Sequence, residues 1–432
     1  MIRTTTLSAA ALLGLTLLAP TGAGAAATGC QGGTATIVGS AGQPVTGTEG
    51  ADIIVTAGAS RVNALGGNDL ICVTGDPSAV PEDVRTVVVS AGAGNDRVEA
   101  TTPGWGTLTT LDAGDDSYLG ATGADQEIRT EESLSFTDTG VDTVRVTSGV
   151  ATVYTGAPSR SSSDVVEIDS GMVQWTGLMT PEGRLTGGPA STLRTYARSG
   201  DAVIDAAAGT AVTETSSATF SGFGQLEYAT SAYKGTVTFR GTDDADWFSV
   251  EARDTYNRVV DLRGGRDFYS SDGFGNGRSS YDGGAGRDQL LLATPRQDVA
   301  ADLDEGRFVG RQGRRTVRRT FVDFEDLALS ARTAKVDGSA RGEEIALRAC
   351  RADVSADAGP DRVHLDILLI GWDNPGCPSR RGSVDGGRGD DVLTGSPGRD
   401  RIVGGPGTDV ANGGAGRDTC VAEKRTSCAV PR

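Results

Sequence analysis

The C-terminal stretch "GGRGDDVLTGSPGRDRIVGGPGTDVANGGAGRDTCV" runs from Gly386 to Val421 and repeats every nine residues. Glycine permits backbone angles that other residues avoid, so each repeat predicts a six-residue turn followed by a three-residue strand. An aspartate fills the sixth position, two residues after a glycine, in all four repeats: Asp391, Asp400, Asp409 and Asp418. The eighth position is expected to face the interior, and it holds Leu393, Ile402, Ala411 and Cys420.

Two such repeats complete one coil of about eighteen residues, so turns two repeats apart stack on the same side. Neighbouring strands lie ~4.8 Å apart. We therefore expect Asp391 beside Asp409, and Asp400 beside Asp418. Carboxylates at that separation repel each other, which favours a cation between them. Ca²⁺ suits the position because it takes about six to eight oxygen ligands, from carboxylates and carbonyls alike. Metal binding would then drive folding.

Weaker copies of the pattern occur along the chain. "GTEGADIIV" begins at Gly47, "ALGGNDLIC" at Ala64 and "AGAGNDRVE" at Ala91, and the last places its aspartate three nine-residue steps beyond the one before. A further copy, "GGAGRDQLL", begins at Gly283. These copies add four candidate ligands: Asp52, Asp69, Asp96 and Asp288. Other copies are degenerate, such as those with Ser60 or Glu343 at the acidic position, and for them a metal-free solenoid turn stays open.

The four regular repeats resemble the haemolysin-type, or RTX, calcium-binding nonapeptide. The resemblance implies a parallel β-roll in which Ca²⁺ lies between stacked turns, held by the aspartate carboxylate and by turn carbonyls. It assigns this role to Asp391, Asp400, Asp409 and Asp418, and more weakly to Asp288, Asp52, Asp69 and Asp96. The chain departs from the family by placing Arg287, Arg399 and Arg417 directly before the key aspartate. Those arginines either point to solvent or pair with the ligands.

The composition agrees with an all-β chain of short strands and tight turns. The 432 residues include 63 glycines, about twice the usual share of ~7%, and only 5% aromatics. Residues 145–240 are rich in Thr, Ser, Val and Ala, with the period-two alternation typical of strands. We predict a parallel β-roll or β-helix solenoid built from Gly-Asp turns, with irregular β segments between repeat arrays. The net charge of −17 argues against a nucleic-acid partner.

Five regions are expected: a signal peptide (1–27), a degenerate repeat array (28–144), a β-rich segment (145–240) and two repeat-containing solenoid units (241–335 and 336–432). The four regular nonapeptides belong to the last unit. The sequence also contains a larger duplication, because "DAVIDAAAGTAV" from Asp201 resembles "DVAADLDEGRFV" from Asp298, offset by 97 residues.

The N-terminus indicates export. Arg3, the apolar run Leu7 to Leu18 and small residues up to Ala27 form a secretory signal. The run is too short to span a bilayer, so no transmembrane segment is expected in the mature chain. The protein is predicted to be secreted, either free or at the cell surface.

Six cysteines fit an oxidising compartment and allow fifteen pairings. Proximity favours Cys30–Cys72, Cys350–Cys377 and Cys420–Cys428. The alternative for Cys30 is lipidation, because "AATGC" loosely resembles a lipoprotein box.

Catalytic signatures are missing from the sequence. His364 is the only histidine, and no GxSxG, HExxH, P-loop lysine or zinc spacing occurs. We therefore expect a secreted calcium-binding repeat protein that is not an enzyme, with a structural or adhesive role and a cell-surface polysaccharide or protein as partner. "RQGRRTVRR" (311–319) offers a site for an anionic polymer, or is a solvated hairpin.

The alternative function is an extracellular carbohydrate-active enzyme on a parallel β-helix, with the repeats as a stability module. A deep acidic cleft with stacked aromatics would favour the enzyme, and a smooth solenoid would favour the scaffold.

Overall fold

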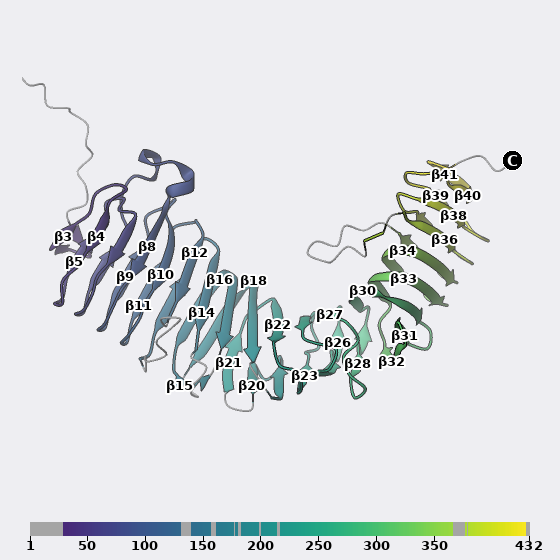
Figure 1. Ribbon diagram of the computed structural model, residues 1–432, viewed down its shortest axis with the longest axis horizontal. Helices are drawn as coiled ribbons and strands as arrows, with labels where there is room; N and C mark the ends of the chain where they lie inside the picture. Colours follow the sequence, from purple (N-terminus) through teal and green to yellow (C-terminus); the bar gives the residue numbers. More distant parts are fainter. Residues whose placement is uncertain are drawn as a thin grey trace, which may run out of the picture.

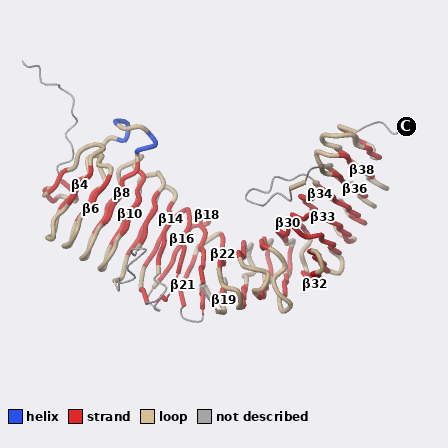
Figure 2. The backbone as a smooth tube through the Cα atoms, in the orientation of Figure 1, coloured by secondary structure: helices blue, strands red, loops and turns tan. Residues whose placement is uncertain are grey.

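The computed structural model describes residues 29–130, 140–156, 161–176, 178–179, 183–197, 200–213, 217–365, 376–377 and 379–428. The predicted signal peptide lies outside the described residues. Strands and turns make up nearly all of the described chain (Figure 2). The helical exceptions among these residues are two 3₁₀ turns, η1 (Pro77–Ala79) and η2 (Glu82–Val84). The predicted all-β solenoid is confirmed.

In the N-terminal half, each coil contributes one strand to each of two parallel ladders (Figure 1). The first ladder contains β3 (Ile37–Val38), β5 (Ile53–Val55), β7 (Leu70–Cys72), β9 (Arg97–Ala100), β11 (Ser117–Gly120), β13 (Thr143–Val146), β16 (Val165–Thr176), β18 (Arg184–Ala197) and β21 (Ser217–Ser221). The second contains β4 (Pro44–Thr46), β6 (Arg61–Asn63), β8 (Thr86–Ser90), β10 (Gly106–Thr110), β12 (Gln126–Arg129) and β14 (Ala151–Thr155), and then the C-terminal parts of β16 and β18.

The second ladder continues into the C-terminal half. It adds β22 (Gln225–Thr230), β24 (Trp247–Glu251), β27 (Phe268–Asp272), β30 (Gln289–Asp302), β33 (Asp326–Ser339), β34 (Glu344–Asp357), β35 (Arg362–His364), β37 (Val392–Thr394), β39 (Val410–Asn412) and β41 (Lys424–Thr426). Opposite it lie β19 (Ala202–Asp205), β23 (Thr236–Arg240), β25 (Asn257–Asp261), β28 (Ser280–Asp282) and β32 (Arg315–Val322), followed by the C-terminal parts of β30, β33 and β34 and then β36 (Arg381–Asp385), β38 (Arg399–Val403) and β40 (Thr419–Val421).

The expected duplication appears as two antiparallel excursions from the solenoid. In the first, β20 (Thr210–Thr213) pairs with β19 and β21; in the second, β31 (Arg307–Gln312) pairs with β30 and β32. Three short pairs complete the sheets: β1 (Gly29–Cys30) with β2 (Gly33–Thr34), β15 (Ser161–Ser162) with β17 (Leu178–Met179), and the turn strands β26 (Gly264–Gly265) with β29 (Ala285–Gly286).

The stack of coils curves, so that both ends of the molecule turn toward the same side (Figure 1). Strand pairing also runs across the sequence boundaries predicted at 144/145 and 335/336, because β13 and β33 each span one of them. The coil architecture is therefore continuous from the degenerate array to the regular repeats.

The interior is a narrow column of side chains from both ladders. In the C-terminal coils it contains the predicted eighth-position residues, all fully buried: Leu393, Ile402, Ala411 and Cys420. The middle coils depart from the small-residue composition of the rest, with stacked pairs such as Phe239 and Phe248, whose ring centroids are 4.0 Å apart. The aromatic residues are few, and the ring contacts among the described residues lie between Tyr228 and Phe324.

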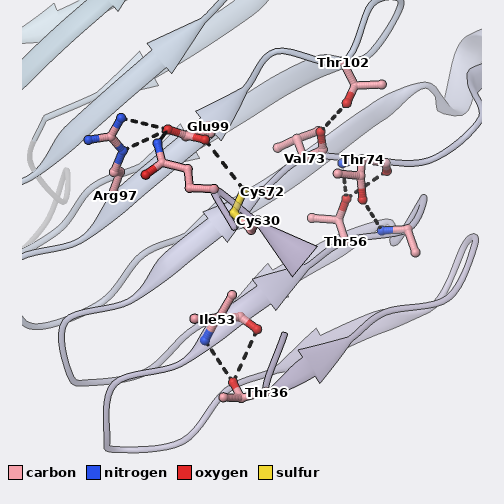
Figure 3. Close-up of a disulfide and its surroundings, with 12 residues drawn as sticks. Cys30, Thr36, Ile53, Thr56, Cys72, Val73, Thr74, Arg97, Glu99 and Thr102 are labelled. Atoms are coloured by element: carbon pink, nitrogen blue, oxygen red, sulfur yellow. Dashed lines mark hydrogen bonds and ion pairs between the residues drawn. A yellow bond between two sulfur atoms is a disulfide. The ribbon is translucent and has the colours of Figure 1, made fainter. Parts of the chain in front are cut away.

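Three disulfides reinforce the coils and match the pairing favoured by proximity: Cys30–Cys72, Cys350–Cys377 and Cys420–Cys428. Figure 3 shows the first, which ties β1 to β7 beside Glu99, a residue that is ion-paired to Arg97 at 2.8 Å. Because the sulfur of Cys30 is bonded to Cys72, the lipidation alternative is not the arrangement found.

Coil length differs from the expected eighteen residues outside the regular repeats. Asp96, three nine-residue steps beyond Asp69, would fall on the opposite edge of an eighteen-residue coil. The structure instead stacks it directly on Asp69, because the intervening coil has 27 residues. The additional residues include η1 and η2. The Asp76 side chain accepts the Ser78 amide N–H and caps the start of η1.

Candidate metal-binding turns

Acidic residues occupy one recurrent position in the solenoid, directly before a strand at the end of a turn. Along the first ladder of strands, the backbone N–H of each such acid donates to the carboxylate of the acid one coil further on. Asp52 donates to Asp69 at 2.8 Å, Asp69 to Asp96 at 2.8 Å and Asp96 to Asp116 at 2.6 Å. Asp142 and Asp164 continue the series, which we call the N-terminal ladder.

Two further series lie before strands of the second ladder. The middle ladder comprises Asp246, Asp267, Asp288 and Glu325. The C-terminal ladder comprises Glu343, Asp361, Asp391, Asp409 and Glu423. Stacked aspartates thus line more than half of the solenoid.

The predicted stacking of the four regular repeats is confirmed. The Asp391 N–H donates to Asp409 Oδ1 at 3.0 Å, and on the opposite edge the Asp400 N–H donates to Asp418 Oδ1 at 2.8 Å. Each pair is separated by one eighteen-residue coil, as expected. The role of these aspartates as metal ligands stays a prediction.

A second carboxylate oxygen is left over in most of these turns. One oxygen accepts the neighbouring amide N–H, whereas the other is buried and has no hydrogen-bond partner, as for Glu343 Oε2. The aspartates with such an Oδ2 include Asp69, Asp96, Asp267, Asp288, Asp361, Asp391, Asp409 and Asp418. All eight side chains belong to residues that are at most 2% exposed. A buried carboxylate oxygen without a donor is costly unless a cation accompanies it.

Burial dominates the protonation of these groups. It raises the pKa of Asp96 and Asp267 to about 7, and that of Asp288 and Asp391 to about 6, with adjacent carboxylates adding to the effect. The metal-free turns therefore hold their negative charge poorly. A bound dication would remove that penalty.

The glycines of the turn make the space around Oδ2. A Cβ placed on Gly386 would lie 2.3 Å from Asp391 Oδ2, and one placed on Gly404 would lie 2.1 Å from Asp409 Oδ2. In these two regular repeats, glycine keeps the first position of the turn open. The donor set at the turn is carboxylate and carbonyl oxygen, the set that Ca²⁺ prefers. The turns with a free Oδ2 therefore fit calcium.

Two of the predicted ligands have a different environment. Asp52 Oδ2 accepts from the Thr48 N–H at 2.7 Å and from the Thr48 hydroxyl at 2.9 Å. Asp400 Oδ2 accepts from the N–H and the hydroxyl of Ser396, at 2.7 and 3.1 Å. Neither carboxylate has an oxygen without a partner.

The arginines that precede key aspartates do not pair with them. Arg287 forms a bidentate ion pair with Asp326, at 2.7 and 2.9 Å, rather than with its neighbour Asp288. Arg399 and Arg417 are exposed. The candidate ligands are therefore not neutralised by the adjacent arginine.

Asp267 and Asp361 belong to the same class of turn but were not among the predicted ligands. Each has the required glycine two positions earlier, Gly265 and Gly359. Both turns have a larger residue, Arg263 or Asp357, where the regular repeat has its second glycine. Glycine at the fourth position is the signal that finds them.

Comparison with known proteins agrees with this geometry. Residues 385–420 match the family model of the RTX calcium-binding nonapeptide repeat, in four copies. No curated protein and no solved structure matches the chain. Within the described residues, no helix has both the length and the apolar character needed to cross a membrane. The C-terminal block thus carries calcium-binding repeats on a β-solenoid.

Proposed function

We propose that this chain, whose residues 385–420 are four RTX calcium-binding nonapeptide repeats, is a secreted structural or adhesive protein whose solenoid folds with calcium. The observation that carries the proposal is the row of buried Oδ2 atoms without hydrogen-bond donors in Asp391, Asp409 and Asp418. Calcium supplies the positive charge and the coordination that these oxygens lack. The chain's own contribution is to hold them one coil apart.

Export agrees with this function. Extracellular fluids offer far more free calcium than a bacterial cytoplasm, and three disulfides require an oxidising compartment. The chain would leave the cell with its repeats unfolded, and calcium would complete the coils outside.

Calcium titration followed by far-UV circular dichroism tests the proposal. The mature chain is compared with a variant that has asparagine at Asp391, Asp400, Asp409 and Asp418. Calcium should increase the β signal of the wild type, with a smaller change in the variant. Identical spectra with and without calcium in the wild type would refute calcium-coupled folding.

The β31–β32 hairpin is the surface best suited to an adhesive contact. Five of its arginines are exposed, in a protein of net charge −17: Arg307, Arg311, Arg314, Arg315 and Arg318. A sulfated or uronic polysaccharide would meet a local positive field there. Changing Arg315 and Arg318 to serine should weaken retention on an immobilised polyanion, and retention equal to that of the wild type would exclude the hairpin as the docking surface.

A cleft in the middle of the solenoid favours the second candidate function, a carbohydrate-active enzyme. Its volume is about 790 Å³, and the residues that line it include Glu227, Glu251 and Asp272. Burial raises the pKa of Glu227, as a general acid requires, although Arg194, 3.6 Å away, acts in the opposite direction. None of the described lining residues is aromatic, so the cleft lacks the sugar-stacking platform expected of such an enzyme.

Release of reducing ends from polysaccharides, measured with wild type and Glu227→Gln, decides between the two functions. We expect no release by either protein. Release by the wild type that Glu227→Gln abolishes would establish the enzyme and overturn the purely structural role.

A further inference from the structure

The acidic turns fall into two backbone conformations. In nine turns the second and fourth residues both have positive φ, as in 404–409, where Gly405 has φ 114° and Gly407 has φ 158°. We call these the open turns; they are 64–69, 91–96, 111–116, 262–267, 283–288, 356–361, 386–391, 404–409 and 413–418. Eight of them end at the aspartates named above, whose Oδ2 is buried without a partner, and the ninth, 111–116, ends at Asp116 of the N-terminal ladder.

Four other turns contain no residue with positive φ: 47–52, 241–246, 338–343 and 395–400. Each has a hydroxyl residue at its second position: Thr48, Thr242, Ser339 and Ser396. In each, this hydroxyl and its own backbone N–H both donate to the carboxylate at the sixth position. We call these the hydroxyl-closed turns.

In the hydroxyl-closed turns that end in aspartate the carboxylate is part of a complete hydrogen-bond network, whereas Glu343 in 338–343 keeps a buried Oε2 without a partner. In 395–400 the Gly398 N–H donates to the Ser396 hydroxyl at 3.2 Å, and that hydroxyl donates to Asp400. The same relay runs through Thr48 in 47–52 and through Thr242 in 241–246. Hydrogen-bond donors therefore converge on the carboxylate, which is the environment of a bound anion and repels a cation.

In the open turns the fourth-position N–H points away from the carboxylate. The Gly389 N–H donates to Pro406 O at 3.1 Å and the Gly94 N–H to Ala113 O at 2.8 Å, in both cases across to the next coil. With that donor turned outward, Oδ2 faces the interior of the turn alone. The difference between the two classes lies in the backbone, so it does not depend on how the carboxylates ionise.

We propose that the second residue of each acidic turn decides whether the turn binds calcium. The hydroxyl-closed turns that end in aspartate, 47–52, 241–246 and 395–400, are metal-free, because the hydroxyl and the amide N–H occupy the place of the ion. Open turns bind calcium, and they include Asp69, Asp96, Asp267 and Asp288, outside the four matched repeats. The proposal rests on the calcium function proposed above and narrows it.

One consequence lies inside the matched repeats. Asp400 belongs to the third-to-last nonapeptide, yet its turn, "GSPGRD", is hydroxyl-closed. Calcium is therefore expected at Asp391 and Asp409 on one edge and at Asp418 on the other, but not at Asp400. Asp52 and Asp246 are likewise the first residues of their ladders, and in each the Thr hydroxyl takes the place of the metal.

Bound calcium per chain, measured by equilibrium dialysis and elemental analysis of the mature protein, tests the rule. Three variants carry the same isosteric change: Asp267→Asn, Asp391→Asn and Asp400→Asn. The first two should each lower the calcium content by one ion or more. Asp400→Asn is the matched control inside the repeats, and its calcium content should equal that of the wild type.

Thermal unfolding of the same proteins gives a second measurement. In EDTA, Asp267→Asn should be at least as stable as the wild type because it removes a buried charge, whereas in calcium it should be less stable. Asp400→Asn should lower the midpoint equally in both conditions, since it disturbs the hydrogen bonds of Ser396. A merely structural role for Asp267 would give the same shift with and without calcium.

The outcomes separate the two proposals. A wild type that binds no calcium overturns the calcium function and the rule together. The rule alone is overturned if the wild type binds calcium but Asp400→Asn loses as much bound calcium as Asp391→Asn. It is also overturned if Asp267→Asn loses no bound calcium. If the asparagine variants do not fold, Ser396→Gly tests the rule instead. This change converts the turn to "GGPGRD" and should add one bound calcium. An unchanged calcium content would contradict the rule.

Discussion

Mild acidification should stabilise the calcium-free protein. Burial raises the pKa of Asp96 and Asp267 to about 7 and that of Asp288 and Asp391 to about 6, against ~3.9 for an unfolded aspartate. Between about pH 4 and 7 the folded chain therefore holds protons that the unfolded chain has released. The free energy of unfolding then falls as pH rises through this window and becomes level above it.

The size of the effect follows from how many protons are retained. One proton difference changes the free energy of unfolding by about 1.4 kcal/mol per pH unit. Neighbours such as Asp267 and Asp288 repel each other, so we count one proton for each of the N-terminal, middle and C-terminal ladders. The slope in EDTA is then at most about 4 kcal/mol per pH unit near pH 5.5.

The assay is urea unfolding in EDTA at pH 5, 6 and 7, followed by circular dichroism and repeated in millimolar calcium. The urea midpoint in EDTA should be highest at pH 5. In calcium the trend should weaken or reverse, because the metal binds the deprotonated carboxylates and its contribution grows with pH. An EDTA midpoint that is constant or rises from pH 5 to pH 7 would refute the reasoning, because buried carboxylates without a cation cannot then be the main titrating groups.

Three further perturbations test the packing around the turns. Gly405→Ala should lower the free energy of unfolding in the urea assay by about 2 kcal/mol or more, because Gly405 has φ 114° and a Cβ there would lie 1.9 Å from the Gly387 carbonyl oxygen. Gly277→Ala is the control, since a Cβ at that position meets nothing within 4 Å. Arg258→Met should cost about 3 kcal/mol, since the fully buried guanidinium donates to the carbonyls of Gly273, Asp272 and Ala252, and a thermal midpoint within a degree of the wild type would contradict that. Replacing Cys30 and Cys72 with serine opens a loop closed across a sequence separation of 42 and should cost about 4 kcal/mol, measured as a lower midpoint that dithiothreitol reproduces in the wild type.

The regular repeats could be predicted from sequence because their period is strict. A fixed nine-residue spacing determines which turns stack. The sequence alone therefore predicts the pairing of Asp391 with Asp409 and of Asp400 with Asp418. The eighth-position core residues followed for the same reason. Short separations along the chain likewise favoured the three disulfides that the structure contains.

Elsewhere coil length varies, and spacing alone misleads. The 27-residue coil before Asp96 carries two 3₁₀ turns that no nine-residue count anticipates. The difference between Asp391 and Asp400 was also hidden, because it depends on a single hydroxyl, that of Ser396, and on the sign of φ in the turn. The residue at the second turn position distinguishes the two kinds of turn, but only the hydrogen bonds show that a hydroxyl there contacts the carboxylate.

The parallel stacking of coils has a mechanical consequence. Strands lie across the long axis, so a force applied between the two ends would load the hydrogen bonds of one coil at a time rather than all together. Each eighteen-residue coil occupies about 4.8 Å of the axis and would release about 60 Å of chain when it peels away. Disulfides limit how far the peeling proceeds, since Cys30–Cys72 closes the first coils into a loop. Under tension, such a molecule would unfold coil by coil rather than in a single step.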